Sequence, residues 1–348
     1  MELKLAFIGM GNVGRAFARL LQARRDELAR QHGLAWVVTA IGTAHHGSLI
    51  SETGLDLAGA VQRIESGQSI RALENSEVVS DAAEAIDRCH ADILLETTPL
   101  NAVDGQPAIS YIRRALLRGI SVVSANKGPI AYGYRQLRSL AADRGVMFRF
   151  EGAVMDGCPI FNLAEFCLPG ARILSLAGIL NSTTNLILTG MEDGRSMGDC
   201  LAEARRMGIA EADSDNDLDG WDATVKALAL ANVLLRSDTP AIIAQRTGIK
   251  AVKPEEVRSA QAEGYALRLI ARADASSGTA IITVKPERVP RSSALGCVRG
   301  TSNVLLLKTD VMGEIGVFEN DPGIDQTAYA LLSDLMMIHE ALNRSRNR

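Results

Sequence analysis

Short apolar runs and segments of helical period alternate along the first 150 residues. Runs of strand length, bounded by polar or glycine residues, occupy residues 3–8, 36–41, 92–96, 121–124 and 146–150. Apolar side chains recur at helical spacing in residues 15–28 and 109–118, and residues 51–88 form a peripheral, partly helical stretch. Strands that alternate with helices predict an α/β fold with a doubly wound, mostly parallel sheet in this half.

The second half has a different order of elements. Strand patterns cover residues 172–180, 280–285, 302–307 and 314–318, and helical patterns cover residues 197–206, 222–235, 254–259 and 326–341. This order predicts a second domain of the α+β class. We expect domains at residues 1–150 and 151–317, followed by a segment at 318–348 whose helix packs back on the first domain.

Composition narrows the class of protein. A chain of 348 residues is long enough for two domains with separate cores. The formal net charge of −4 gives no basic field for nucleic acid, and no apolar run reaches membrane-spanning length. The start of the chain lacks a secretory signal pattern. Five cysteines without C-x-x-C spacing predict reduced thiols in a cytoplasmic protein and no zinc site.

The first apolar run is followed by a glycine motif. Gly9, Gly11 and Gly14 form G-x-G-x-x-G with Asn12 and Val13 between them, placed between a predicted strand and a predicted helix. In that context the glycines let the backbone approach a pyrophosphate, and the helix N-terminus supplies N–H donors. We therefore expect a Rossmann-type site for NAD or NADP. A glycine-rich turn without a ligand is the alternative.

Two further segments bear on the cofactor. After the second strand the chain reads G-T-A-H-H-G-S at residues 42–48, without the acid that NAD sites usually place there and without an arginine. This absence predicts that NADP is used at least as well as NAD, and the two histidines are either phosphate ligands or plain surface residues. Thr97 and Thr98 follow the strand at 92–96, at the sheet edge where such folds bind ligands.

Residues 208–230 concentrate acidic side chains before a very apolar helix. A predicted loop holds five of them: Glu211, Asp213, Asp215, Asp217 and Asp219. Asp222 and Lys226 follow at i,i+4 spacing, which places both on one helix face. The helix dipole and desolvation would both lower the pKa of Lys226, while Asp222 would raise it. This pattern fits a lysine that exchanges a proton, or alternatively an ordinary salt bridge beside a solvated loop.

The same stretch resembles the signature of homoserine dehydrogenases, G-Y-x-E-x-D-P-x-x-D-x-x-G-x-D-x-x-x-K. Residues 178–188, G-I-L-N-S-T-T-N-L-I-L, resemble the family's G-x-x-N-G-T-T-N-x-I-L, and S-A-N-K at 124–127 resembles T-A-N-K. Ile209, Ser214 and Ser182 depart from the family's Tyr, Pro and Gly. The resemblance covers nearly the whole chain, while the departures put the fit of the substrate in question.

The resemblance implies a reaction and roles for residues. It implies NAD(P)-dependent interconversion of L-homoserine and L-aspartate 4-semialdehyde, in threonine and methionine biosynthesis, by a homodimer formed through the second domain. Lys226 would carry the proton and Asp222 would orient it, with Lys127 beside the reacting oxygen. The remaining implied contacts are substrate binding by Glu211, Asp217, Asp222 and Thr183, and cofactor binding by Asn126 and Lys127.

Residues 151–160, E-G-A-V-M-D-G-C-P-I, resemble the family's E-A-x-V-x-x-G-x-P-I. In the family this segment holds a monovalent cation through a glutamate and backbone carbonyls. The resemblance thus implies a cation at Glu151 and at the carbonyls of Val154, Asp156 and Cys158. Hard cations favour such oxygen ligands.

Three rival functions stay open. The segment N-S-T-T-N also resembles the S-C-T-T-N of phosphorylating aldehyde dehydrogenases, but Ser182 stands where their thiolate nucleophile would be. The second rival is a non-enzymatic NAD(P)-sensing protein, and the third is a related dehydrogenase for another hydroxy amino acid. The presence of the Asp222–Lys226 pair argues against a protein that has lost its catalytic activity. The turn at 319–323, E-N-D-P-G in place of the family's G-P-G-A-G, argues for one.

Overall fold

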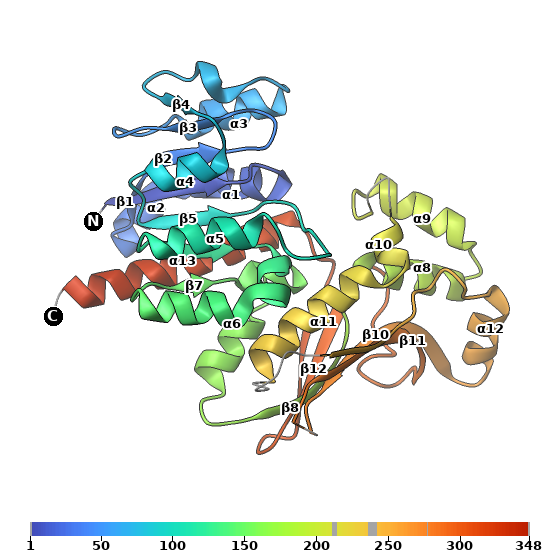
Figure 1. Ribbon diagram of the computed structural model, residues 1–348. Coiled ribbons are helices and arrows are strands. Elements are labelled where there is room, and N and C mark those ends of the chain that lie inside the picture. Colours follow the sequence, from blue (N-terminus) through green and yellow to red (C-terminus); the bar gives the residue numbers. More distant parts are fainter. Residues whose placement is uncertain (1, 211–213, 236–241, 277, 347–348) are drawn as a thin grey trace. The chain divides into compact units, whose positions relative to one another are not determined.

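The five apolar runs of the first 150 residues become five parallel strands of one sheet. The computed structural model describes residues 2–210, 214–235, 242–276 and 278–346. The chain forms two units, Met1–Pro159 with Gly323–Arg348 and Ile160–Pro322 (Figure 1). The functional domain ranges predicted from the sequence stay a prediction, because compactness alone does not assign binding functions.

The sheet of the first unit has the order β4-β3-β2-β1-β5-β6-β7. Its strands are β1 (Glu2–Ile8), β2 (Ala35–Gly42), β3 (Ser48–Ile50), β4 (Glu77–Val79), β5 (Ile93–Glu96), β6 (Ser121–Ser124) and β7 (Phe148–Arg149). The order reverses at β1, which pairs in parallel with both β2 and β5. Open α/β sheets bind ligands at the carboxyl ends of the strands beside such a reversal. The predicted doubly wound fold is confirmed. The antiparallel strands β3 and β4 were not predicted, because three residues are too few to show a period.

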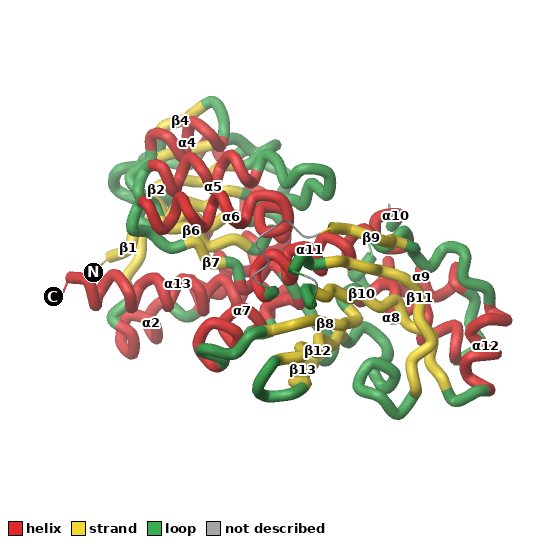
Figure 2. The backbone as a smooth tube through the Cα atoms, turned by 60° about the horizontal axis from the view of Figure 1, so that its bottom comes forward, coloured by secondary structure: helices red, strands yellow, loops and turns green. Residues whose placement is uncertain are grey.

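Helices cover this sheet on both faces. They are α1 (Asn12–Ala23), α2 (Arg25–His32), α3 (Leu57–Glu65), η1 (Ile70–Ala72), α4 (Ala82–Arg88), α5 (Ala108–Leu117), α6 (Lys127–Asp143) and α13 (Ile324–Arg346). The helical pattern predicted over 15–28 is confirmed, with one interruption at Arg24, whose φ of −101° leaves helical geometry and divides α1 from α2. The helix predicted to return to the first domain does so. Leu331 and Leu335 of α13 join the core around Phe7 and Phe17, and α13 runs beside α2 in Figure 2.

The second unit is a mixed sheet of order β13-β12-β8-β10-β11-β9, carrying helices. Its strands are β8 (Ile173–Ile179), β9 (Ile242–Arg246), β10 (Tyr265–Asp274), β11 (Ile281–Pro290), β12 (Asn303–Thr309) and β13 (Glu314–Glu319). Its helices are α7 (Ile160–Asn162), α8 (Ser182–Glu192), α9 (Met197–Arg206), α10 (Asp215–Leu218), α11 (Trp221–Leu234) and α12 (Pro254–Ala262). Within the described residues, no helix is both long and apolar enough to cross a membrane.

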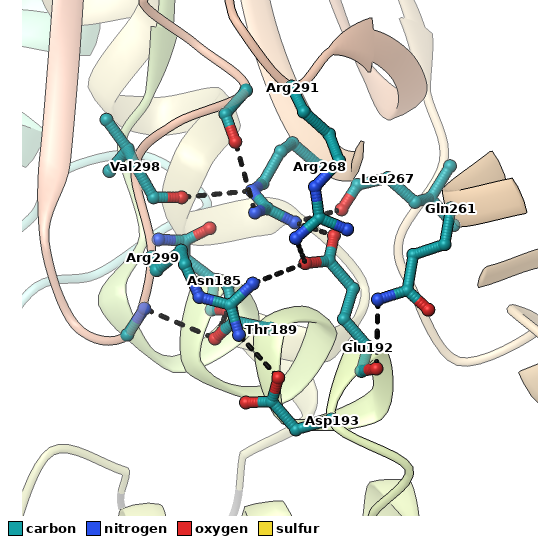
Figure 3. Close-up of polar contacts among 12 residues, drawn as sticks. Asn185, Thr189, Glu192, Asp193, Gln261, Leu267, Arg268, Arg291, Val298 and Arg299 are labelled. Atoms are coloured by element: carbon teal, nitrogen blue, oxygen red, sulfur yellow. Dashed lines mark hydrogen bonds and ion pairs between the residues drawn. The ribbon is translucent and has the colours of Figure 1, made fainter. Parts of the chain in front are cut away.

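Strand β10, at the centre of this sheet, is not predicted by the sequence. Its residues Y-A-L-R-L-I-A-R-A-D include Ala, Leu and Arg, which favour helices intrinsically. Arg268 is fully buried within the strand and donates from Nη1 to Oε1 of Glu192 on α8 at 2.6 Å (Figure 3). Burial lowers the pKa of Arg268 while Glu192 raises it. The buried guanidinium is compensated by this carboxylate and by the carbonyl oxygens of Val298 and Leu267, to which it also donates.

Candidate active site

The three motif glycines of the first unit have different surroundings. Gly9 has a φ of 93°, and a Cβ there would lie 2.6 Å from the backbone carbonyl of Thr97. A Cβ at Gly14 would lie 2.7 Å from the carbonyl oxygen of Gly9, so α1 packs closely on the turn. A Cβ at Gly11 would meet no described atom within 4 Å. The fold therefore requires glycine at Gly9 and Gly14, whereas the space beside Gly11 is available for a ligand.

A groove of about 840 Å³ opens from this turn. It is lined by Gly9 and Gly11, by Thr97 and Thr98, and by the segment 42–48 after β2. The structure thus brings these predicted cofactor residues together. Asn12, Val13 and Gly14 form the first turn of α1, where Asn12 accepts a hydrogen bond from Arg15 and Val13 packs on the core. The groove fits an extended dinucleotide, because a helix N-terminus and a backbone turn face open space.

A buried carboxylate that sequence reasoning missed fixes the other end of the groove. Glu96, the last residue of β5, is fully buried. One of its oxygens accepts from the backbone N–H of Thr98 at 2.8 Å and from the Thr98 hydroxyl, and the other accepts from Ser124 Oγ at 2.7 Å. Burial raises the pKa of Glu96, and these hydrogen bonds lower it. In the sequence, the feature that could have pointed to this site is an acidic residue at the end of an otherwise apolar strand.

Asn126 and Lys127 lie at the start of α6, beside this network. Asn126 caps α6 by accepting from the Gly128 N–H at 3.0 Å, and its Nδ2 donates to the carbonyl of Thr98 at 3.1 Å. Lys127 is the first residue of the helix and is half-buried. Two strand ends, after β5 and β6, are thereby hydrogen-bonded to each other with Lys127 beside them.

The second unit assembles the other predicted group. Lys226 Nζ lies 3.1 Å from Asp222 Oδ2 and donates to the carbonyl oxygen of Leu180 at 2.8 Å. The Nδ2 of Asn181 donates to Asp217 Oδ1 at 2.7 Å and to Asp222 Oδ2 at 3.0 Å. The pair is therefore part of a partly buried network that joins α11 to the start of α8, and it is more than an isolated surface salt bridge.

Asn181 was not singled out from the sequence, although an Asn just before a helix is a known capping signal. Its Oδ1 accepts from the Thr184 N–H at 2.8 Å, which caps α8. The amide oxygen of Asn181 thus caps α8, and its Nδ2 bridges the two carboxylates. Thr183, predicted to bind substrate, is buried beside Asn181 and lies close enough to Asp217 to lower the pKa of that carboxylate.

The acidic loop separates into two sets. Asp217 faces the network, and burial together with the charge of Asp222 raises its pKa. Asp215 and Asp219 instead lie 2.8 and 2.9 Å from Lys250 Nζ at the surface. Glu211, predicted to bind the substrate, and Asp213 lie outside the described residues. The alternative predicted from the sequence, a solvated acidic loop, therefore holds for Asp215 and Asp219 but not for Asp217.

The segment predicted to hold a cation forms two short helical turns, η2 (Glu151–Ala153) and η3 (Met155–Gly157). Glu151 is buried, and its N–H donates to Asp334 Oδ2 at 2.7 Å. Asp156 has a φ of 44°, and its carboxylate accepts from Thr327 at 3.2 Å. Val154 and Cys158 flank this sharp turn. Among the described residues, no three or more His, Cys, Asp or Glu side chains are placed to hold a metal ion, so a cation here would depend on backbone oxygens.

The acids of the turn at 319–323 are hydrogen-bonded within the second unit. Glu319 is buried and accepts from Asn303 Nδ2 at 3.2 Å, and Asp321 accepts from the Thr301 hydroxyl at 2.9 Å. Asn303 Nδ2 also donates to Ser182, one of the departures from the family pattern, at 3.2 Å. The effect of these acids on the cofactor stays a prediction.

A doubly wound sheet with a nucleotide groove, joined to a unit bearing a lysine–carboxylate network, defines the class of NAD(P)-dependent dehydrogenases. Comparison with known families agrees. Residues 9–151 match the model "Homoserine dehydrogenase, NAD binding domain", and residues 159–336 match "Homoserine dehydrogenase". The chain belongs to the homoserine dehydrogenase family and is an NAD(P)-dependent oxidoreductase.

Individual relatives span the whole chain. An NAD(+)-dependent homoserine dehydrogenase of Pseudomonas canavaninivorans is 34% identical over 99% of this chain and 98% of its own length. The Methanocaldococcus jannaschii homoserine dehydrogenase is 35% identical over 98% of this chain and 100% of its own. A hyperthermophilic archaeal homoserine dehydrogenase in complex with NADPH has a TM-score of 0.82 at 29% identity, covering 98% of each chain. The relatives thus differ in the cofactor that their names record.

Proposed function

We propose that this enzyme interconverts L-homoserine and L-aspartate 4-semialdehyde with Lys226 as the proton carrier. The single observation that carries the proposal is the network of Asn181, Asp217, Asp222 and Lys226. A surface salt bridge needs neither a bridging amide nor a buried second carboxylate. In a proton-transfer site such groups hold the lysine in place and balance its charge.

The protein's task in this reaction is to manage one proton. The oxidised cofactor, when bound, accepts a hydride from the carbon that bears the substrate hydroxyl. In that direction the neutral amine of Lys226 accepts the hydroxyl proton. In the reverse direction its ammonium returns the proton to the carbonyl oxygen. Asp222 and the Leu180 carbonyl fix Nζ through two hydrogen bonds, which reduces the reorganisation needed for transfer.

Substrate binding would use the remaining carboxylates. We place the substrate ammonium at Asp217, with Glu211 as a second carboxylate implied by the family resemblance. Asn181 orients Asp217 through its hydrogen bond, and Thr183 lies beside the carboxylate and lowers its pKa. Because Asp217 is buried and close to Asp222, a cationic substrate group would relieve the repulsion between the two carboxylates. This gives the site a preference for an amino acid over a simple hydroxy acid.

In the first unit we assign the cofactor to the groove beside Gly11. The first turn of α1, Asn12 to Gly14, supplies N–H donors to the pyrophosphate. Thr97, Thr98, Asn126 and Lys127 mark the nicotinamide end, with Lys127 toward the reacting oxygen. These roles rest on the open space at Gly11 and on the hydrogen bonds that tie the strand ends together.

Two finer assignments belong to the same proposal. A monovalent cation bound by Glu151 and the carbonyls of Val154, Asp156 and Cys158 predicts that turnover in KCl or NaCl exceeds turnover in tetramethylammonium chloride at equal ionic strength. A homodimer through the second unit is supported by apolar residues at its sheet edge, such as the half-exposed Phe318 on β13. Sedimentation that shows a monomer at micromolar concentration would refute the dimer.

The central experiment follows NAD(P)H with purified protein and L-homoserine, L-serine, L-threonine or 4-hydroxybutyrate as substrate. We expect turnover with homoserine and little with 4-hydroxybutyrate, which lacks the ammonium. Turnover with another hydroxy amino acid alone would favour a related dehydrogenase. Cofactor binding without any turnover would favour an NAD(P)-sensing protein.

A further inference from the structure

The groove in the first unit contains a buried hydroxyl that the fold leaves unpaired. Ser48, the first residue of β3, is 1% exposed and lines the groove close to the end of β2. Its Oγ has no hydrogen-bond partner among the described residues. A buried polar group without a partner is destabilising, so its persistence calls for an explanation such as a ligand or water. In dinucleotide-binding sheets, this end of the groove faces the adenosine ribose.

An arginine from a distant segment reaches the same place. Arg71 belongs to η1 and lines the groove, 23 residues beyond Ser48, the last residue of the segment after β2. Within that segment the sequence shows no basic residue except histidine. The Cγ and Nε of Arg71 lie 2.8 and 3.0 Å from the position that a Cβ of Gly47 would occupy. Gly47 therefore makes room for the arginine stem across the loop. Within the described part of the chain, the Arg71 side chain has no hydrogen bond or ion pair.

Three other titratable side chains of the groove lining, Arg15, Asp81 and His46, already have partners. Arg15 donates to the carbonyl of Met10 at 2.9 Å and lies 3.6 Å from Glu65. Asp81, the acid of the groove lining, caps α4 by accepting from the Glu84 N–H at 2.8 Å. His46 has its Nδ1 2.9 Å from the carbonyl of Gln68. The cation placed to meet a new anion is therefore Arg71.

We propose that Arg71 and Ser48 form a subsite for the 2′-phosphate of NADP(H), which makes Arg71 the residue that sets cofactor preference. A guanidinium offers paired donors that match phosphate oxygens, and the Ser48 hydroxyl supplies a further donor in the same groove. NAD(H) has a 2′-hydroxyl there, and the end of β2 offers no carboxylate to accept from it. The inference rests on the cofactor-binding part of the proposed function. Its competitor is that Asp81 accepts hydrogen bonds from the ribose and Arg71 is merely solvated.

Titration calorimetry with adenosine 2′-monophosphate and adenosine 5′-monophosphate tests the subsite without any turnover. For the wild type we expect the 2′-phosphate isomer to bind at least about tenfold more tightly. Arg71→Ala should raise its Kd about 10- to 100-fold and leave the Kd of the 5′ isomer within about twofold, with partial recovery in Arg71→Lys. Arg113→Ala, which removes an exposed arginine on α5 outside the groove lining, is the charge-matched control and should change neither.

Ser48→Ala separates a ligand role from a structural one. Removing an unpaired buried hydroxyl should raise the Tm of the free protein, yet it should weaken binding of adenosine 2′-monophosphate. Equal binding of the two isomers by the wild type, or Arg71→Ala without effect, overturns the subsite. A loss of NADH affinity in Asp81→Ala, with NADPH unchanged in Arg71→Ala, establishes the competitor. Absence of homoserine turnover with both cofactors refutes the proposed function but leaves these titrations interpretable.

Discussion

The two units build their sites from different materials. In the first, backbone groups and close glycine contacts shape the groove, as where Gly9 lies against the backbone of Thr97. In the second, ionisable side chains on two helices form the site, as where Asn181 bridges Asp217 and Asp222. A backbone site is tolerant of changes in charge but not of added atoms. A side-chain site is tolerant of small changes in shape but not of lost charges.

Each unit also ties a helix to its sheet by one buried arginine–carboxylate pair. In the first, Arg149 on β7 donates to Asp334 on α13 at 3.0 Å. In the second, Arg268 on β10 donates to Glu192 on α8, which also accepts from Arg299 at 2.7 Å. Helix α8 is the one that begins at Asn181 and Thr183. The helix that carries Thr183 is therefore anchored at its far end by this pair.

The largest expected effect is the loss of turnover in Lys226→Ala. A general acid–base group typically contributes about 10²- to 10⁴-fold to rate, so kcat should fall by that factor while NAD(P)H binding stays nearly intact. Asp222→Ala should lower kcat too, and the double variant should be little worse than the worse single variant, because paired groups act as a unit. Steady-state kinetics and cofactor titration measure both quantities.

Lys250→Ala is the matched control for this prediction. Lys250 is a lysine of the same unit, paired with Asp215 and Asp219 at the surface. Its loss should leave kcat near the wild-type value. Near wild-type turnover in Lys226→Ala would show that the network is structural and that the proton moves by another route.

The next effect is on stability and should be confined to the second unit. Glu192→Gln keeps the size of the side chain but leaves Arg268 buried without a carboxylate, which should cost about 3–5 kcal/mol. The chain has two tryptophans, Trp36 in the first unit and Trp221 in the second. Urea unfolding followed by Trp221 fluorescence, in a Trp36→Phe background, reports the second unit alone.

If the effect is confined to the second unit, Glu192→Gln should not lower the stability of the first unit. Urea unfolding followed by Trp36 fluorescence, in a Trp221→Phe background, measures this. Glu263→Gln serves as the surface control, since Glu263 pairs with Arg288 in solvent. It should leave the Trp221 transition unchanged. If Glu192→Gln and Glu263→Gln unfold alike, the buried pair does not anchor α8.

In the first unit, Gly11→Val should raise the Kd of the cofactor by about 100-fold or more, equivalent to about 2.7 kcal/mol, with the fold intact. The φ of Gly11 is −69°, which suits any residue, and its Cβ would enter open space. Gly14→Ala should lower the Tm in addition to the cofactor affinity, because its Cβ would lie 2.7 Å from the Gly9 carbonyl oxygen. Calorimetric titration and thermal unfolding of the two variants measure the contrast. Wild-type affinity in Gly11→Val would remove the cofactor from this groove.

The smallest effect concerns Asp217. Asp217→Asn should raise the KM for homoserine about 10- to 100-fold, the loss expected for one charged hydrogen-bond partner. The pKa of Asp217 is raised in the folded protein. Its ionisation therefore destabilises the folded state at pH values above the usual aspartate pKa of about 3.9, and it has no effect on stability at lower pH. The variant should therefore gain Tm relative to the wild type as the pH rises through this window. Asp219→Asn, a surface acid of the same loop, should show neither effect, and an equal KM change in both variants would contradict the role of Asp217.

Local patterns predicted most of the first unit. Its five parallel strands were visible as apolar runs, and G-x-G-x-x-G was visible because that turn is built from consecutive residues. Strand β10 was not visible, since the residue that makes it unusual, Arg268, is compensated by Glu192, 76 positions away. Glu96 was assigned to a strand but not to the site, because its partner Ser124 reaches it only when β5 and β6 pair.

The sequence by itself determined the two kinds of sheet, the glycine turn, and the i,i+4 pair of Asp222 and Lys226. Those features depend on residues that are neighbours in the chain or on one helix turn. The tertiary structure alone decided that Asp217 turns inward while Asp219 pairs with Lys250, that Asn181 bridges the carboxylates, and that Arg71 lines the nucleotide groove. These depend on burial and on partners from other segments, and the free energy of a buried charge or hydroxyl is set by what the fold brings to it.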